Sequence, residues 1–385
     1  MGKLRKRLAS TLVFASAMIA VIAPILLAAP LQAQSQSQTT LRGIDPKLLA
    51  KASAGDTSAQ KLVAFAYEKG DGVQQDFAKA AAWYRKAAEQ GDAFAQISLG
   101  RLYEQGQGVK QDGAQAATWY RKAAEQGDAD AQLLLGELYE FGQGVKQDGA
   151  QAATWYRKAA EQGEADAQFR LGGLYQFGEG VPQDYAQAAV WSRKAADQGH
   201  ADAQFILGGL YLKGQGVPQD YAQAAIWSRK AADQGRARAQ YILGTLYFRG
   251  QGEPQDYAQA AVWFRKAADQ GLAEAQFNLS ALYRLGRGVQ QDYAQAAIWA
   301  RKAAEQGNTD AQYDLGLLYG YGQGLPQSFP DAYFWLDLAA AGTSGTDHEK
   351  YAKSRDSVAA KLSPDELSKV QERAAEWFAE HPAKQ

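Results

Sequence analysis

Residues capable of acid–base, nucleophilic or metal chemistry are scarce in this sequence. Cysteine is absent, which excludes thiolate nucleophiles, thiolate metal ligands and disulfides. Its three histidines are His200, His348 and His381, and no serine–histidine–acid or metal-ligand grouping can be assembled around them. We therefore predict that the chain is not an enzyme and has no catalytic, metal-binding or cofactor-binding residues.

Two other repeated features could be mistaken for chemical sites. Glycine pairs such as Gly106 and Gly108 resemble a phosphate cradle, but a dinucleotide fingerprint needs a third glycine and a preceding strand, which are missing. Aspartates that follow these loops, such as Asp112, could form acid–base pairs. Their position directly before an apolar helical pattern is typical of helix N-caps. We interpret the loops as helix–helix turns and the aspartates as caps.

A tryptophan recurs every 36 residues along the chain, at Trp83, Trp119, Trp155, Trp191, Trp227, Trp263, Trp299 and Trp335. These rings could stack on sugars or bases, but their strict period beside alanines favours packing in a core. Such a period is typical of a tandem array, in which each unit is too small to bury its apolar face alone and must stack on its neighbours.

Each unit contains two helical stretches around a glycine-rich break, as the second unit shows. Its first stretch places Leu99 and Tyr103 on one helical face and ends at Gly106, where a left-handed cap fits. Its second stretch follows Asp112 and places Trp119 on an apolar face. Paired helices of this kind must position any functional side chain.

The unit resembles the Sel-one-like repeat (SLR) family, α-solenoids related to tetratricopeptide repeats. In the second unit the resemblance is carried by Ala93, Ala95, Leu99, Gly100, Tyr103, Gly106, Gly108, Val109, Asp112, Ala116, Trp119, Lys122, Ala123, Ala124 and Gly127. Departures occur at Val63-Ala64, Glu253, Ser280, Ser328 and Leu338. We predict an all-α, right-handed α-solenoid of eight 36-residue helix-turn-helix repeats with capping helices at both ends.

The N-terminus indicates export. Lys3, Arg5, Lys6 and Arg7 precede an uncharged apolar run at residues 8–29, and Ala33 lies at a possible cleavage point. We expect a signal peptide at 1–33, with a retained membrane anchor as the alternative. The remaining expected segments are a disordered tether at 34–44, an N-terminal capping helix at 45–55, the repeats at 56–343 and C-terminal capping helices at 344–385.

Positions that vary between units indicate where a partner could bind. In each first helix four variable positions form one stripe beside the core stripe. The predicted partner-binding residues are Phe141, Arg170, Phe177, Lys213, Arg238, Tyr241, Phe248, Arg249 and Arg284. The stripe changes from acidic and aromatic to basic along the array. A solvated face that drifts in sequence is the alternative interpretation.

The net charge of −1 argues against bulk nucleic-acid binding. The SLR resemblance implies a non-catalytic scaffold of the periplasm or cell envelope that binds a protein or peptide in a concave groove, with a regulatory or host-interaction role. We expect a periplasmic or secreted monomer, or an inner-membrane-anchored adaptor facing the periplasm. The rival function is a hydrolase that binds β-lactams or cell-wall fragments, by analogy with cysteine-rich SLR proteins, whose disulfides this chain lacks.

Overall fold

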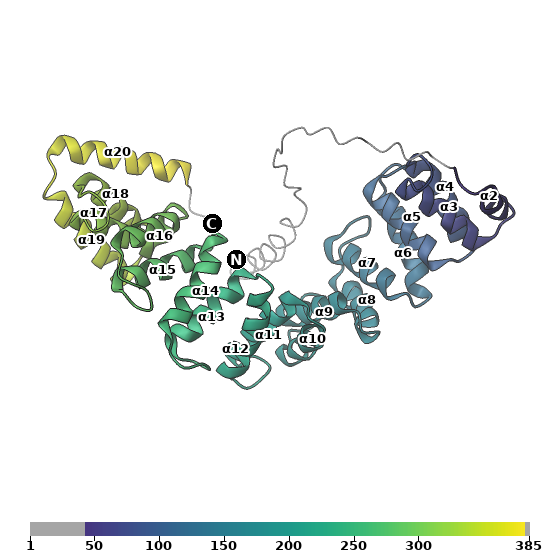
Figure 1. The fold of residues 1–385 in the computed structure, drawn as a ribbon, viewed down its shortest axis with the longest axis horizontal. Coiled ribbons are helices and arrows are strands. Elements are labelled where there is room, and N and C mark those ends of the chain that lie inside the picture. Colours follow the sequence, from purple (N-terminus) through teal and green to yellow (C-terminus); the bar gives the residue numbers. More distant parts are fainter. Residues whose placement is uncertain (1–42, 382–385) are drawn as a thin grey trace. The chain divides into compact units, whose positions relative to one another are not determined.

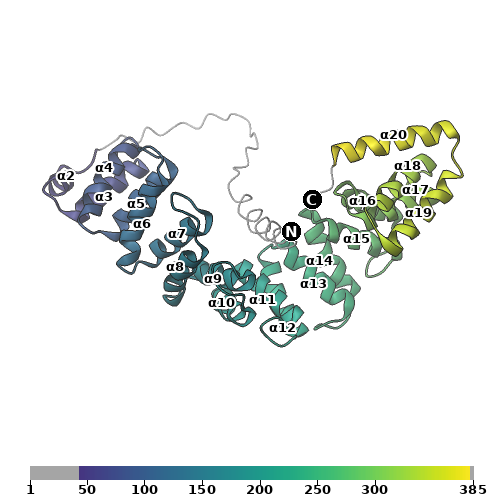
Figure 2. The same ribbon diagram turned by 180° about the vertical axis from the view of Figure 1, so that it is seen from behind.

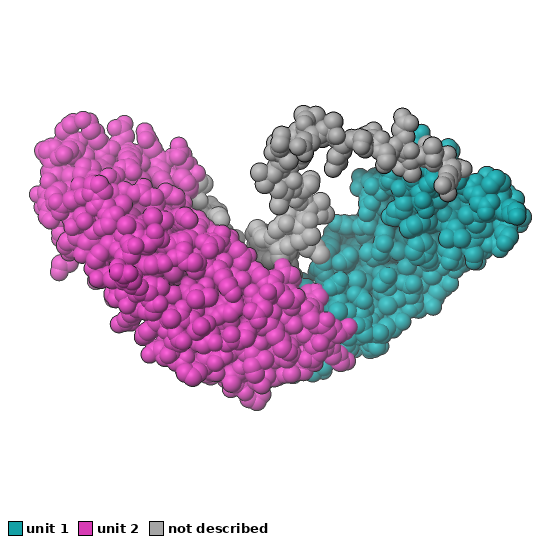
Figure 3. All heavy atoms as spheres, viewed as in Figure 1, with its two compact units in different colours: residues 1–191 teal, residues 192–385 magenta. Residues whose placement is uncertain are grey.

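The computed structural model describes residues 43–381, which form nineteen α-helices and no strand (Figures 1 and 2). The predicted all-α solenoid is confirmed. The predicted signal peptide at 1–33 lies outside the described residues. The helices fall into two compact units, divided between Trp191 and Ser192 (Figure 3). No helix between residues 43 and 381 is long and apolar enough to cross a membrane.

Eight helix pairs make up the repeats. The first helices of the pairs are α3 (Thr57–Lys69), α5 (Ala93–Gln105), α7 (Ala129–Phe141), α9 (Ala165–Phe177), α11 (Ala201–Lys213), α13 (Ala237–Arg249), α15 (Ala273–Leu285) and α17 (Thr309–Tyr321). The second helices are α4 (Phe77–Glu89), α6 (Gly113–Glu125), α8 (Gly149–Glu161), α10 (Tyr185–Asp197), α12 (Tyr221–Asp233), α14 (Tyr257–Asp269), α16 (Tyr293–Glu305) and α18 (Phe329–Ala341). Helix α2 (Pro46–Ser53) precedes them, and α19 (Gly345–Ala359) and α20 (Pro364–Glu380) follow.

Helix ends follow the cap residues of the sequence. In repeat 2 the Asp112 carboxylate accepts hydrogen bonds from the backbone N–H groups of Ala114 and Gln115, both at 3.0 Å. Helix α5 ends at Gly106, whose φ of 68° is in the left-handed region that favours glycine. The glycine-rich loops and the aspartates are therefore turns and helix caps.

The tryptophans join neighbouring repeats, as unit 1 shows. Trp119 is buried in a cluster with Ala80, Ala81 and Tyr84 of the preceding second helix. Alanine on the receiving helix lets the backbones approach closely, and the indole ring then fills the space between repeats.

A glycine in the first helix makes room for an aromatic ring of the second. A Cβ atom on Gly100 would lie 2.4 Å from the Tyr120 ring, and one on Gly244 would lie 2.7 Å from the Phe264 ring. In repeat 7 the glycine position holds Ser280 and the ring position holds Ala300. The Ser280 hydroxyl donates to the Ala296 carbonyl at 2.7 Å in the space that the missing ring leaves. Ser280 is thus accommodated rather than destabilising.

Each first helix also buries one glutamine: Gln60, Gln96, Gln132, Gln168, Gln204, Gln240, Gln276 and Gln312. In unit 2, Gln240 donates to the Ala232 carbonyl of the preceding second helix at 3.1 Å and accepts from Gln270 at 2.8 Å. Both polar groups of the buried amide are therefore satisfied. We call this series of buried glutamines the glutamine ladder. Its hydrogen bonds connect a first helix to the second helices before and after it.

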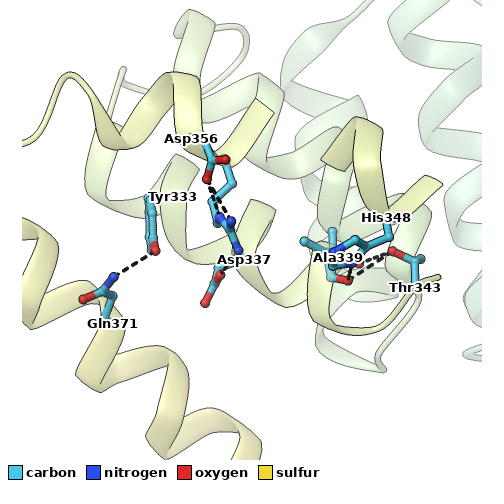
Figure 4. A network of polar contacts seen from close by, with 9 residues as sticks. Tyr333, Asp337, Ala339, Thr343, His348, Asp356 and Gln371 are labelled. Carbon is cyan, nitrogen blue, oxygen red and sulfur yellow. Dashed lines mark hydrogen bonds and ion pairs between the residues drawn. The ribbon is translucent and has the colours of Figure 1, made fainter. Parts of the chain in front are cut away.

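The C-terminal helices α19 and α20 pack against α18. In the preceding repeats an arginine of the second helix donates to a tyrosine hydroxyl of the next first helix, as Arg301 does to Tyr319. The corresponding positions in α18 and α19 hold an ion pair, with Arg355 of α19 3.1 Å from Asp337 of α18 (Figure 4). Gln371 of α20 points toward the Tyr333 hydroxyl in the same view and donates to it at 3.2 Å.

Candidate partner-binding face

The predicted partner-binding residues all lie on first helices, and we call the variable stripe of these helices the first-helix face. Unit 1 carries Phe141, Arg170 and Phe177 on α7 and α9. Unit 2 carries Lys213, Arg238, Tyr241, Phe248, Arg249 and Arg284 on α11, α13 and α15.

Arg170 is the buried centre of the first-helix face in unit 1. Its side chain is 7% exposed and lies 3.0 Å from Glu137 and 3.6 Å from Glu140. The guanidinium also lies 5.6 Å from the centre of the Phe141 ring, which is 44% exposed. Phe177 is half-buried. Arg170 is therefore placed to position Phe141 and the two glutamates, while Phe141 is open to solvent.

Burial dominates the electrostatics around Arg170. Desolvation raises the pKa of Glu137, the Arg170 charge opposes this rise, and the nearby Glu140 carboxylate adds to it. Burial also raises the pKa of Glu179, with a further contribution from Glu140. The Tyr156 hydroxyl donates to Glu140, and its pKa is raised mainly by burial. The Arg170 guanidinium is thus the cation that opposes the rise in the pKa of Glu137, while Glu140 also accepts from the Tyr156 hydroxyl.

Sequence reasoning missed an apolar patch on α3 and α5 in unit 1. Leu62, Phe65 and Phe94 are exposed large apolar side chains. The ammonium of Lys69 lies 5.5 Å from the Phe65 ring centre, and that of Lys61 lies 5.9 Å from the Phe94 ring centre. These residues occupy the variable positions of the first two units, so reading the same positions there would have found them.

Three predicted cations are exposed on the first-helix face of unit 2: Lys213, Arg238 and Arg249. Two predicted aromatic residues are half-buried between α13 and α14. The Phe248 ring centre lies 5.3 Å from that of Tyr257, and the Tyr241 ring centre lies 5.8 Å from that of Phe264. These rings therefore contribute to the packing of α13 on α14 and expose only part of their surface.

Arg284 is less available than its sequence position suggested. Its guanidinium lies 3.4 Å from the carboxylate of Asp314 on the next first helix. Burial raises the pKa of Asp314, and the Arg284 charge lowers it. Arg236 likewise pairs with Asp202 at 2.8 Å. The basic character of the face in unit 2 is therefore carried by Lys213, Arg238 and Arg249.

Small side chains form the floor of the face between these cations. Gly209, Thr245 and Ala281 occupy the same position in successive first helices, and all three are partly exposed. A Cβ atom on Gly209 would meet no atom within 4 Å, so the space above this glycine is open. A backbone could approach the helices closely here.

The histidines have structural partners. His200 accepts a hydrogen bond from the Ala203 N–H at the start of α11, at 3.2 Å. His348 lies 2.8 Å from the Ala340 carbonyl, and the His381 ring stacks on Trp377. Over residues 43–381 the side chains form no group of three or more histidines and carboxylates that could hold a metal ion.

Two open pockets of unit 1 lie away from the first-helix face, beside the loops. Their volumes are about 590 and 680 Å³, and equivalent residues of successive repeats line them. The first contains Arg121, Glu125 and Lys146 around Trp155. Neither is lined by a histidine or by a predicted partner-binding residue.

Comparison with known proteins identifies the repeat. The sequence pattern described as Sel1 repeat matches eight consecutive segments, at residues 57–92, 93–128, 129–164, 165–200, 201–235, 237–272, 273–308 and 309–344. No curated protein matches the chain.

One solved structure supports this assignment, and two others are similar in sequence. A Sel1 repeat protein from Oxalobacter formigenes is 33% identical, with 87% of this chain and 99% of that chain covered and a TM-score of 0.63. A protective antigen of uropathogenic Escherichia coli strains with an SLR fold is 33% identical over 86% of each chain, with a TM-score of 0.47. Helicobacter pylori cysteine rich protein B is 32% identical over 36% of this chain and 99% of that chain, with a TM-score of 0.29. The chain therefore belongs to the Sel1 repeat family, whose members typically act as scaffolds for protein–protein interaction.

Proposed function

We propose that this protein is a non-catalytic scaffold that binds an extended segment of a partner protein on its first-helix face. The observation that carries the proposal is in unit 2. There the exposed cations Lys213, Arg238 and Arg249 border the same face as the small residues Gly209 and Thr245. A peptide backbone fits against small residues, and cations beside it select acidic side chains.

Partly exposed aromatic rings supply the apolar component of this surface. Tyr241 and Phe248 are held by Phe264 and Tyr257, so an anchor residue would meet rings that are already ordered. Ordered rings lose little conformational entropy on binding, which favours them as contact residues. The partner segment we propose is acidic with at least one apolar anchor.

We also propose that the scaffold works in the cell envelope after export. The support is the sequence of residues 1–33, with four basic residues before an uncharged apolar run. Mass spectrometry of the mature protein should find a new N-terminus at or near Gln34. Full-length chain confined to the membrane fraction would instead support the retained anchor.

The binding proposal is tested by reversing charge on the face. Lys213→Glu, Arg238→Glu and Arg249→Glu together should abolish capture of partners from an envelope extract and weaken affinity for a captured partner at least about 10-fold at low salt. The wild-type affinity should fall as salt rises, because exposed charges are screened.

A matched control makes the same charge change elsewhere. Lys51, Lys110 and Lys146 are exposed and lie off the first-helix face. Replacing all three by glutamate should leave capture and affinity unchanged. Equal losses in both triple variants would mean that net charge alone governs binding, and no loss in the first variant would refute the proposed face.

A further inference from the structure

Exposed aliphatic side chains recur on the second helices of the later repeats. Directly before the repeat tryptophan, repeats 2 and 3 carry Thr118 and Thr154, whose hydroxyls donate to carbonyls of their own helix at 2.8 Å. In unit 2 the same position holds Ile226, Val262 and Ile298, which are 46–48% exposed. We call these three residues the aliphatic row. Because the side chains face water, packing within the repeat does not explain the change from threonine.

The same position in α18 shows how such a side chain can be covered. It holds Phe334, which is only 3% exposed because α20 lies against it. Val370 and Ala374 of α20 belong to the same buried cluster. The Arg373 guanidinium lies 4.0 Å from the Phe334 ring centre and 2.7 Å from Asp331. The chain thus seats one amphipathic helix on this position of its own last repeat.

We propose that the aliphatic row is a second docking surface, which binds an amphipathic, negatively charged helix of a partner protein. The row continues the position that α20 covers, so the bound helix would use the kind of contact that α20 makes with α18. This surface lies on the second helices, and the inference does not depend on the proposed function of the first-helix face.

The spacing of the row defines the apolar pattern of the bound helix. Ile226, Val262 and Ile298 occupy the same position in three consecutive second helices. A helix that crosses α12, α14 and α16 therefore needs apolar residues at a regular interval along one of its faces. The buried side of α20 has this pattern, with Leu367 and Ala374 as one pair and Val370 and Trp377 as another.

Small residues beside the row allow a close approach. Ala222, Ala258 and Ala294 are exposed one helical turn before Ile226, Val262 and Ile298. An alanine surface lets a helix backbone come near, so that the larger aliphatic side chains can reach between the side chains of the incoming helix. The surface therefore fits a helix better than a flat sheet edge.

Charge selects an acidic helix. One turn after the row, the exposed lysines Lys230, Lys266 and Lys302 hold their ammonium groups 3.9–4.1 Å from the centres of tryptophan rings. These lysines are ordered cations beside the apolar contact. The helix α20 itself has five carboxylates against two cationic side chains, so its sequence has the required apolar spacing and charge.

The proposal is tested with a synthetic peptide that has the sequence of residues 363–381. The labelled peptide is titrated against the intact protein by fluorescence anisotropy. Replacing the row by threonine, as Ile226→Thr, Val262→Thr and Ile298→Thr, copies repeats 2 and 3. This variant should bind the peptide at least about 10-fold more weakly, because three buried aliphatic contacts are lost.

Leu285→Thr is the matched control, since Leu285 is an exposed aliphatic residue of the first-helix face in the same unit. It should bind the peptide as the wild type does. The thermal unfolding of both variants should be unchanged, because the altered side chains are exposed. Failure of the wild type to bind the peptide, or equal binding by the threonine variant, overturns the proposal. Self-association that the threonine variant abolishes would also overturn it, by assigning the row to a second copy of this chain.

Discussion

Replacement of Arg170 by methionine should destabilise unit 1, although the sequence predicts Arg170 as a partner contact. The guanidinium is 7% exposed and lies between Glu137 and Glu140. Methionine fills the aliphatic volume but leaves two carboxylates close together without a cation. The variant should therefore lose stability through electrostatics more than through packing.

The expected loss of unfolding free energy in Arg170→Met follows from the burial of Arg170 and its two glutamate partners. Removing one partner of a fully buried ion pair costs about 3–5 kcal/mol. The side chains of Glu137 and Glu140 retain 29% and 16% exposure, so water compensates part of the loss. We expect a decrease in unfolding free energy of about 2–3 kcal/mol at pH 7.

The loss of unfolding free energy in Arg170→Met should be larger at pH 7 than at lower pH. The pKa of Glu137 is already raised in the folded state. Ionisation of this carboxyl therefore lowers the free energy of unfolding as pH rises above the ordinary pKa of a glutamate. Without Arg170 the pKa of Glu137 rises further and the penalty at neutral pH grows. The difference between variant and wild type should therefore shrink as pH falls from 7 toward the ordinary pKa of a glutamate.

Urea unfolding followed by circular dichroism at pH 7 and pH 5 measures both effects. Adding Glu137→Gln to the variant should recover at least half of the loss at pH 7, because it removes one uncompensated charge. Phe141→Ala serves as the control, since that ring is 44% exposed and its removal leaves no buried charge, so it should cost less than Arg170→Met. A loss below about 0.5 kcal/mol for Arg170→Met, equal at both pH values, would refute the structural role of the guanidinium.

Three further predictions concern the core and are measured by chemical unfolding. Trp191→Ala should cost about 3–5 kcal/mol and Trp377→Ala less, because Trp191 is buried in its cluster and Trp377 is only half-buried; equal small losses would contradict the core role of the repeat tryptophan. Gln240→Leu should cost about 1–2 kcal/mol, because the glutamine ladder loses two buried hydrogen bonds; an unchanged midpoint would show that the ladder adds nothing. Gly244→Ser should cost about 1–3 kcal/mol through collision with the Phe264 ring, and Phe264→Ala in the same chain should relieve the collision; strictly additive losses would argue against it.

The sequence alone was sufficient to predict the fold because the same local signals recur in every repeat. Gly106 and Asp112 illustrate this, since each acts on its own helix end and needs no distant contact. The repeat tryptophans were likewise interpretable from their period. Local signals of this kind fix where helices begin and end.

Contacts between helices were harder to predict. Gln240 looks like a surface residue by type, and only the packing of α13 on α12 places its amide against the Ala232 carbonyl. Arg170 and Arg284 had the spacing of exposed residues, but carboxylates on neighbouring first helices turn them into ion-pair partners. The partners of a long charged side chain depend on the facing repeat, which the periodicity of one helix does not reveal.

The Ser280 and Ala300 pair determines which pieces of this chain can be exchanged. The Ser280 hydroxyl occupies the space that an aromatic ring fills in other repeats. The first and second helices of repeat 7 must therefore be exchanged as a pair. An exchange whose boundaries fall in the turns between repeats, such as at Gly271 and Gly307, keeps the pair intact. A boundary between α15 and α16 could place Ser280 against an aromatic ring such as that of Phe264. The helix pair, and not the single helix, is therefore the unit by which an array of this kind can be lengthened, shortened or recombined.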